Sequence, residues 1–213
     1  MTLIAIIIPD RGDRPELTEH CFYQINRQTV KPEKIYHIDH PPADEKIDLV
    51  SRIKKGIQLA KNDGIDRVAI IENDDYYPDN YIESITWCQL TGILLTIYIN
   101  IIHDRHKVIL HPGRSSLFCT AFEISAFEDF EFPGPETIDL DKHIWRHKCF
   151  KILHYPKELP IGIKHGMGKC AGWYHTNAFH QMKPLNEALF KYYIKRKQSR
   201  DFYRCMKNNT NSA

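Results

Sequence analysis

The feature that most constrains the fold is a short apolar run that ends in a cluster of acids. Residues 68–71 are apolar, and Glu72, Asp74 and Asp75 follow directly. Such a run is typical of a strand buried in a parallel sheet, and open α/β folds bind ligands where these strands end. Crowded carboxylates raise one another's pKa unless a cation lies among them, and oxygen ligands suit Mg²⁺ or Mn²⁺. A solvated acidic turn before Pro78 is the alternative.

The chain before this strand alternates between strand and helix patterns. Strands are predicted at 3–8 and 34–39, and helices at 15–28, at 48–62 with Asp48 as the cap, and from about residue 79. A β-α-β unit implies adjacent parallel strands joined by a right-handed crossover. The pattern therefore predicts an α/β, Rossmann-like fold in three layers, α/β/α, with a mostly parallel central sheet and nucleotide-binding loops.

Composition places few limits on function. The chain has 213 residues, which favours a single domain, and a net charge of +2, which neither indicates nor excludes an anionic partner. Its six cysteines are widely spaced without a CxxC pair, which fits reduced thiols. With no basic leader at the N-terminus, a cytoplasmic location is expected.

The second half of the chain is expected to be more irregular. The apolar stretch 85–102 is interpreted as a helix end, a turn near Thr91 and Gly92, and a buried strand, with no integral membrane segment. Further strands are expected at 107–110, 117–123 and 151–154, the last of the chain. A helix is expected around Ile144, followed by a loop rich in Gly and His at 162–175 and a basic helical tail at 185–207.

Five features of the first 80 residues follow one another in an informative order. They are strand 4–9 with its charged loop, the stretch Arg27-Gln28-Thr29 with Pro32, strand 35–39 with its final aspartate, Arg52, and the acidic segment 72–78. In this order they resemble the GT-A glycosyltransferases, in particular the inverting family-two group, whose metal motif has an aspartate where this chain has Glu72. The resemblance implies a GT-A-like fold, with a nucleotide-sugar-binding half at 1–102, an acceptor half at 103–184 and a tail at 185–213.

The resemblance also implies a nucleoside-diphosphate sugar as donor and Mn²⁺ or Mg²⁺ as cofactor. Asp74 would bind the cation, and Glu72 would face the ribose or the outer shell of the metal. The residues assigned to the donor by the resemblance are Pro9, Asp10, Arg11, Asp39, Arg52 and Asn73. Arg114 is a further candidate for contact with donor phosphate or acceptor.

An inverting enzyme needs a base that takes the proton of the acceptor hydroxyl. In the family that the sequence resembles, this base is the aspartate of a Glu-Asp motif that is followed by Asp-Leu, just before a helix. Here the corresponding segment is 136–141, without a Glu-Asp pair. Asp139 is the first candidate and Asp141 the second. The alternative is that one of them only caps the following helix.

The loop rich in Gly and His is the second candidate for the metal and phosphate site. Its glycines let backbone amides approach phosphate, and Lys164 and Lys169 add charge. Related enzymes have a comparable loop with a metal-binding histidine, for which His165 and then His175 are the candidates here. A histidine ligand favours Mn²⁺ over Mg²⁺.

Two other function classes remain open at this stage. A nucleotidyltransferase would also place metal-binding acids on an α/β sheet, although the loop after the first strand has one glycine only, Gly12. The basic tail, with aromatic residues between its cations, would suit a nucleic-acid-binding module. For an enzyme, the acceptor would be a glycan, a lipid-linked molecule or a modified nucleic-acid base.

Overall fold

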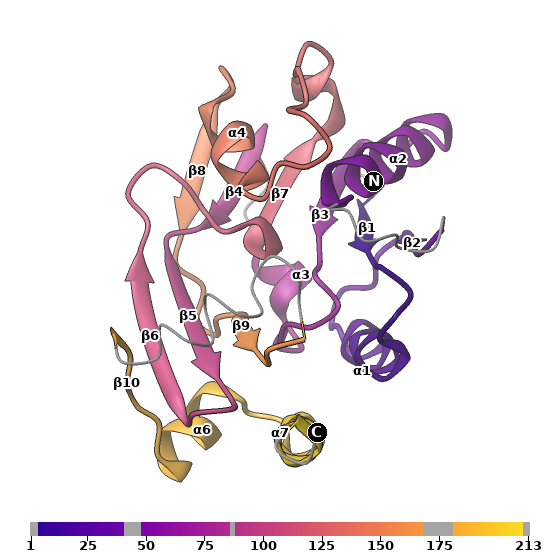
Figure 1. The fold of residues 1–213 in the computed structure, drawn as a ribbon. Coiled ribbons are helices and arrows are strands. Elements are labelled where there is room, and N and C mark those ends of the chain that lie inside the picture. Colours follow the sequence, from indigo (N-terminus) through magenta and orange to yellow (C-terminus); the bar gives the residue numbers. More distant parts are fainter. Residues whose placement is uncertain (1–3, 41–47, 86–87, 168–180, 211–213) are drawn as a thin grey trace.

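The computed structural model describes residues 4–40, 48–85, 88–167 and 181–210 (Figure 1). Within these residues the chain forms two mixed β-sheets with helices packed against them. The protein is therefore of the α/β class.

The larger sheet has the strand order β2-β1-β3-β7-β4-β8. Its strands are β1 (Ile4–Pro9), β2 (Lys34–Ile38), β3 (Arg67–Ile70), β4 (Leu90–Ile93), β7 (Thr120–Glu123) and β8 (Lys151–His154). β1 pairs in parallel with β2 and β3, and β4 pairs in parallel with β8. β7 lies antiparallel between β3 and β4. The prediction of a mostly parallel sheet was wrong, because this inserted strand makes both of its pairings antiparallel.

The smaller sheet has the strand order β10-β6-β5-β9. It comprises β5 (Leu95–Asn100), β6 (Arg105–Leu110), β9 (Ile161–Lys164) and β10 (Lys183–Pro184). β9 pairs in parallel with β5, and the other two pairings are antiparallel. The expectation that residues 151–154 form the last strand was wrong, because β9 uses residues that had been assigned to a glycine-rich loop.

Helices pack on both faces of the larger sheet. Alternate residues of a strand point to opposite faces, and Ile7 of β1 packs with α2 (Leu49–Asn62) and α4 (Leu140–Arg146). Ile6 packs on the other face with α1 (Pro15–Asn26) and α3 (Tyr81–Ser84). The short 3-10 helices η1 (Leu117–Cys119) and η2 (Ile124–Phe127) flank β7.

The C-terminal helices cover the smaller sheet. Phe190 of α6 (Glu187–Tyr193) and Tyr203 of α7 (Lys197–Thr210) pack against Ile99 of β5 and Ile163 of β9. In Figure 1 both helices lie at the end of the molecule away from α2 and α4. Arg196, between the two helices, pairs with Asp79 in the loop before α3. The C-terminal helices are thereby attached to the segment that follows the acids.

The apolar stretch 85–102 does not form the predicted turn at Thr91 and Gly92. Both residues lie inside β4, and β5 begins at Leu95. A side chain at position 92 would lie within 2.5 Å of Trp145, so the glycine serves close packing of α4 on β4. Among the residues that the structure describes, no helix is long and apolar enough to span a bilayer.

Candidate functional site

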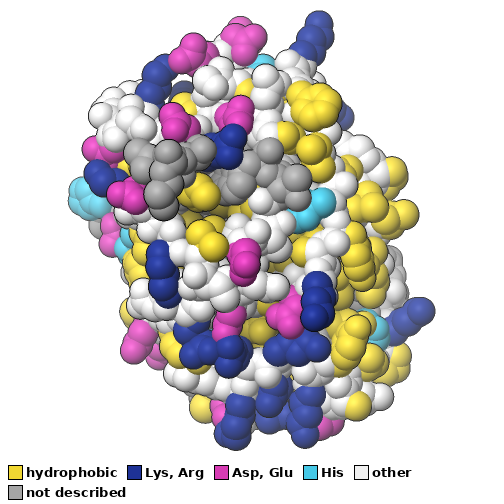
Figure 2. All heavy atoms as spheres, turned by 180° about the vertical axis from the view of Figure 1, so that it is seen from behind, with side chains coloured by type: hydrophobic (Ala, Val, Ile, Leu, Met, Phe, Trp, Pro, Cys, Tyr) yellow, Lys and Arg dark blue, Asp and Glu magenta, His cyan; other side chains and the backbone are white. Residues whose placement is uncertain are grey.

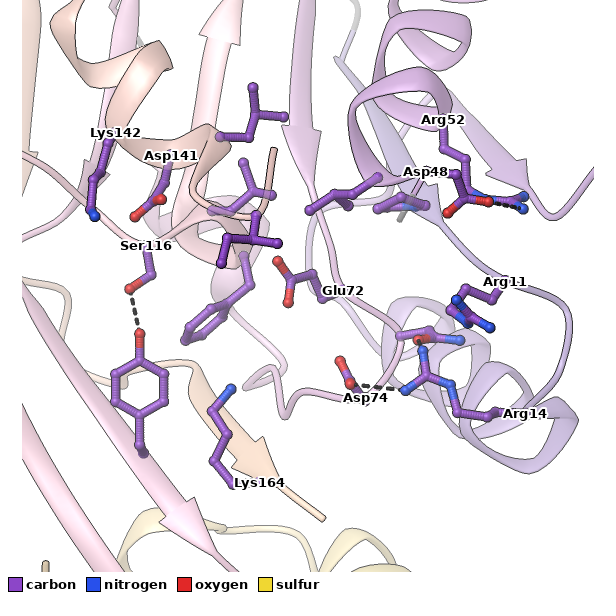
Figure 3. Close-up of a pocket in the computed structure, with 18 of the residues that line it drawn as sticks. Arg11, Arg14, Asp48, Arg52, Glu72, Asp74, Ser116, Asp141, Lys142 and Lys164 are labelled. Carbon is purple, nitrogen blue, oxygen red and sulfur yellow. Dashed lines mark hydrogen bonds and ion pairs between the residues drawn. The ribbon is translucent and has the colours of Figure 1, made fainter. Parts of the chain in front are cut away.

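A cleft of about 400 Å³ opens where β3 ends. Its walls come from the loop after β1, the start of α2, the loop after β3, the start of α4 and the end of β9. Figure 3 shows Glu72 and Asp74 between Lys164 on one side and Arg11 and Arg14 on the other. The cleft therefore contains a cluster of acids with basic side chains on two sides of it.

The acids form a compact group at the end of β3. One carboxylate oxygen from each of Glu72, Asp74 and Asp75 lies within 4.8 Å of the others. Asp75 is buried, and its Oδ1 accepts a hydrogen bond from the backbone amide of Ile163 at 2.7 Å. Its Oδ2 is buried without a hydrogen-bond partner in the described part of the chain. A buried carboxylate oxygen without a partner is costly unless a ligand satisfies it.

Gln24 of α1 and Gln28, just after the end of this helix, hold the loop that carries the acids. Gln24 donates to the carbonyl of Asp75 at 3.0 Å and accepts from the amide of Tyr77 at 2.7 Å. Gln28 donates to the carbonyl of Pro78 at 2.8 Å and accepts from the amide of Ile82 at 3.0 Å. Each side chain replaces the two hydrogen bonds that an irregular backbone lacks. Gln28 belongs to the stretch that resembles the glycosyltransferase family, and in this structure it supports the loop that follows the acids.

Asp74 is the most connected of the three acids. Arg14 donates to its Oδ2 at 3.2 Å, and Nε2 of His165 lies 2.9 Å from the same oxygen. Nδ1 of His165 accepts a hydrogen bond from the amide of Met167 at 3.2 Å. In the neutral ring the proton therefore lies on Nε2 and is donated to Asp74.

The surroundings of the three acids shift their pKa values in different directions. Burial, and then the charge of Asp74, raise the pKa of Glu72 to about 7. Burial alone would raise the pKa of Asp74, but its hydrogen bond with His165 and the charge of Arg14 hold it well below the ordinary value. Burial and Asp74 raise the pKa of Asp75 well above its ordinary value. Close carboxylates cannot all ionise without a cation among them.

Lys164, at the end of β9, lines the cleft beside this cluster. Burial would lower its pKa, but the charge of Asp75 heads the interactions that raise it overall. Its Nζ lies 4.9 Å from the centre of the Tyr98 ring. The side chain is therefore a fixed cation beside the acids.

The opposite wall of the cleft carries one of the two predicted bases. Asp141 in the first turn of α4 lines the cleft and pairs with Arg114. Burial raises the pKa of Asp141, although Arg114 opposes this effect. Asp139 is not among the residues that line the cleft, and it pairs with Lys142 at 2.9 Å. The hydrogen bond from Lys142 lowers the pKa of Asp139.

The residues predicted to hold the donor are only partly brought together. Pro9, Arg11, Arg52 and Asn73 line the cleft. Arg52 is held there by Asp48, whose Oδ2 accepts from its Nε at 2.8 Å. Asp48 stands at the N-cap position of α2, but its side chain makes no capping hydrogen bond.

Asp10 and Asp39 lie apart from the cleft wall. Asp10 is buried and accepts hydrogen bonds from Thr18 and from the amide of Gly12, while Nε2 of His37 lies 2.7 Å away. Burial would raise the pKa of Asp10, but these bonds lower it overall. The side chain of Asp39 is exposed, 3.8 Å from Nδ1 of His37. Neither residue is among those that line the cleft.

Some predicted residues lie outside the described part of the chain, and some cleft residues were not predicted. Lys169 and His175 fall outside the described residues. Arg14, Asp48, Tyr98 and Lys142 line the cleft without having been assigned a role there. Arg14 was missed because nothing in a polar loop before a helix shows which cation turns inward.

The acid cluster has the composition of a site for a hard divalent cation. Mg²⁺ and Mn²⁺ prefer carboxylate oxygens, and Mn²⁺ also accepts imidazole. Asp75 supplies the buried oxygen without a partner, Asp74 is held ionised, and His165 lies within reach of Asp74. These residues fit a bound cation.

Comparison with known proteins adds no family. The chain matches no protein-family model, and a search of curated proteins finds no match either.

Proposed function

We propose that the protein is a metal-dependent glycosyltransferase of the GT-A type, which transfers a sugar from a nucleoside-diphosphate sugar to an acceptor hydroxyl. The observation that carries the proposal is the cluster of Glu72, Asp74 and Asp75 at the end of β3, facing cations across one cleft. Acids that hold a cation and basic side chains that hold a diphosphate are both needed for this chemistry. The order of the motifs in the first 80 residues supports the same class.

The donor would lie along the wall formed by β1, α2 and β9. Arg11, Arg14 and Lys164 supply positive charge where a diphosphate would be held. Pro9, Arg52 and Asn73 form the adjoining wall, where the base and ribose would lie. A divalent cation bound by Asp74, with Glu72, Asp75 or His165, would neutralise the charge that develops on the diphosphate as it leaves.

Asp141 is the better candidate for the base than Asp139. Its side chain lines the cleft across from the acid cluster, whereas Asp139 is not among the lining residues and pairs with Lys142. A raised pKa brings a carboxylate closer to the range in which it accepts a proton efficiently. Arg114 would orient this carboxylate toward the acceptor. A base opposite the leaving group corresponds to a reaction with inversion.

The fold is compatible with this class. Helices lie on both faces of the larger sheet, and the second sheet brings Lys164 and His165 to the acids. We infer a three-layer α/β/α arrangement with a donor half at 1–102 and an acceptor half at 103–184. The acceptor is one of three classes: a glycan, a lipid-linked molecule or a modified nucleic-acid base.

The nucleic-acid-binding alternative receives less support. Several cations of the C-terminal tail already pair with acids, among them Arg196 with Asp79 and Lys207 with Asp104. That alternative also gives no role to the acid cluster. A nucleotidyltransferase would use the same acids, so the two enzyme classes differ in whether a nucleoside diphosphate or a triphosphate binds.

The test is a thermal-unfolding panel of UDP, GDP, their sugar conjugates and nucleoside triphosphates, each with and without Mn²⁺. A ligand at about 100 times its Kd raises the free energy of unfolding by about 2.7 kcal/mol. We expect one diphosphate and its sugar conjugate to raise the Tm only with Mn²⁺. The effect should be absent in Asp74→Asn and unchanged in Asp139→Asn. A shift by triphosphates alone, or one retained in Asp74→Asn, would contradict the proposal.

A further inference from the structure

A second groove lies away from the acid cleft, between the smaller sheet and the end of α6. Its volume is about 240 Å³, and Val108, Tyr155, Tyr192 and Lys195 are among its lining residues. Tyr155 and Tyr192 are 65% and 66% exposed. Large apolar and aromatic side chains that gather at the surface mark interaction sites more often than isolated ones do.

The exposed apolar residues continue along β6. Val108 and Leu110 are two positions apart on this strand and so share one face of the sheet. The register pairs Leu110 with Leu95 and Val108 with Ile97, and both of these partners line the groove. Val108 is 46% exposed and Leu110 is 61% exposed. The groove is therefore the uncovered part of an apolar face whose remainder lies beneath α6 and α7.

Positive charge is concentrated beside this groove. Residues 185–213 contain seven cations and two acids, while the whole chain has a net charge of only +2. Two of the seven cations also pair with acids outside the segment, Asp79 and Asp104. When these two acids and the two inside the segment are subtracted, three positive charges remain. Figure 2 shows hydrophobic side chains along one flank of the molecule and a gathering of Lys and Arg at the end that carries the C-terminal helices.

The cations are held next to the apolar residues. Lys195 lines the groove, and its Nζ lies 4.8 Å from the centre of the Tyr192 ring. Lys157 lines the same groove and is exposed. Ile194 is fully buried, so the turn that presents Lys195 is anchored to the core. Apolar and aromatic side chains beside lysines match the boundary between lipid chains and charged headgroups.

We propose that this groove, together with the basic face of α6 and α7, docks on the surface of an anionic lipid bilayer. Tyr155, Tyr192 and Leu110 enter the headgroup region, while Lys157 and Lys195 contact acidic headgroups. Lys197 at the start of α7 adds a third contact, since its side chain is 81% exposed and its partner Asp201 lies on the surface of the same helix. Nucleic acid would also attract the cations, but it offers nothing to the aliphatic residues of β6. The docking surface is independent of the proposed transfer reaction, because none of these residues lines the acid cleft.

Flotation with vesicles tests the proposal. We expect the protein to bind phosphatidylcholine vesicles that contain about 30% phosphatidylglycerol, and to bind pure phosphatidylcholine much more weakly. Raising NaCl from about 0.05 M to about 0.5 M should weaken binding, since the Debye length shortens. Absence of binding to the anionic vesicles at low salt would overturn the proposal.

Two variants separate the charged and the apolar contributions. The triple variant Lys157→Gln, Lys195→Gln, Lys197→Gln should weaken binding by about fivefold per cation, or roughly 100-fold. The single variant Leu110→Ser should weaken it by about tenfold. Both replace exposed side chains, and a Tm close to that of the wild type confirms that each is folded.

The matched control replaces three lysines of α2, which Figure 1 places at the other end of the molecule. Lys54→Gln, Lys55→Gln, Lys61→Gln removes the same charge and should leave vesicle binding within about twofold of the wild type. Equal losses in the two triple variants would overturn the proposal, because binding would then depend on net charge alone. Tight binding of a single-stranded oligonucleotide that the Lys157, Lys195 and Lys197 triple variant abolishes, without vesicle binding, would assign the surface to nucleic acid instead.

Discussion

The imidazole of His165 donates a hydrogen bond from Nε2 to Oδ2 of Asp74 at 2.9 Å. The two residues are 91 positions apart, and the contact joins the end of β9 to the loop after β3. The amide of Met167 fixes the ring by donating to Nδ1 at 3.2 Å. Because both ring nitrogens are engaged, a histidine held in this way can orient Asp74 beside a cation.

The first prediction concerns this histidine. His165→Ala should weaken Mn²⁺ binding by about 10- to 100-fold, as is typical when a partner of a metal-binding carboxylate is removed. Calorimetric titration of the protein with MnCl₂ measures the change. The control is His143→Ala, because the side chain of His143 is 40% exposed and is not part of the cleft wall. Equal Mn²⁺ affinities for wild type and His165→Ala would exclude a role for His165 in the cation site.

The second prediction concerns the support of the acid loop by α1. Gln24→Ala removes both partners of a buried amide and a buried carbonyl, at Tyr77 and Asp75. Each unsatisfied group costs about 1–3 kcal/mol, so the loss of two partners should lower the free energy of unfolding by about 2–6 kcal/mol. Urea denaturation measures this loss.

The matched control for Gln24 is another glutamine with a side-chain partner. Gln58 on α2 donates to Asn62 at 2.9 Å on an exposed face. Gln58→Ala should change stability by no more than about 0.5 kcal/mol. If Gln24→Ala were equally harmless, the loop would be held by its own sequence instead of by α1.

The fold before residue 80 followed from local pattern, and the fold after it did not. The strand and helix periods of residues 4–71 correspond closely to β1, α1, β2, α2 and β3. The later strands are short, and their partners lie far away in the chain. β7 is antiparallel to β3 because of where it docks, and no property of residues 120–123 alone determines this direction. β9 was not recognised as a strand, because its two apolar residues alternate with a glycine and a lysine.

The candidate site divides along a similar line. The acids at the end of β3 were predicted because strand ends and carboxylates are visible in sequence. That Asp141 and not Asp139 lines the cleft was not predicted, because it depends on how α4 packs beside the cleft. The place of Arg14 in the site could not be predicted without the fold either, since Arg14 contacts Asp74, 60 positions away.

The third prediction follows from the wrong prediction of a turn at Gly92. A Cβ at this position would lie 2.4 Å from Cβ of Ser115 and 2.5 Å from the ring of Trp145. Gly92→Ala should therefore lower the free energy of unfolding by about 1–3 kcal/mol through overpacking. A Cβ added at Gly134 would meet no atom within 4 Å, so Gly134→Ala should be neutral or slightly stabilising. Thermal unfolding of the two variants side by side would show a lower Tm for Gly92→Ala only.

The last prediction concerns pH and the contact between α1 and α7. His20 stacks on Phe202 with ring centres 4.0 Å apart, and its side chain is buried. Burial lowers the pKa of His20 from 6.5 to about 4. Between these two values the unfolded chain binds a proton at His20 and the folded protein does not, so unfolding is increasingly favoured as the pH falls. The stability associated with neutral His20 is complete above pH 6.5 and decreases by about 3 kcal/mol on going down to pH 4.

The variant His20→Phe isolates this contribution, because phenylalanine keeps a ring beside Phe202 and does not titrate. The difference in unfolding free energy between variant and wild type should shift in favour of the variant by about 3 kcal/mol as the pH falls from about 7 to about 4. Urea denaturation at several pH values measures it, and the carboxylates common to both proteins cancel in the difference. A difference that stays constant over this range would mean that His20 titrates alike in the folded and unfolded chain. In that case the stacking of α7 on α1 would not depend on a neutral imidazole.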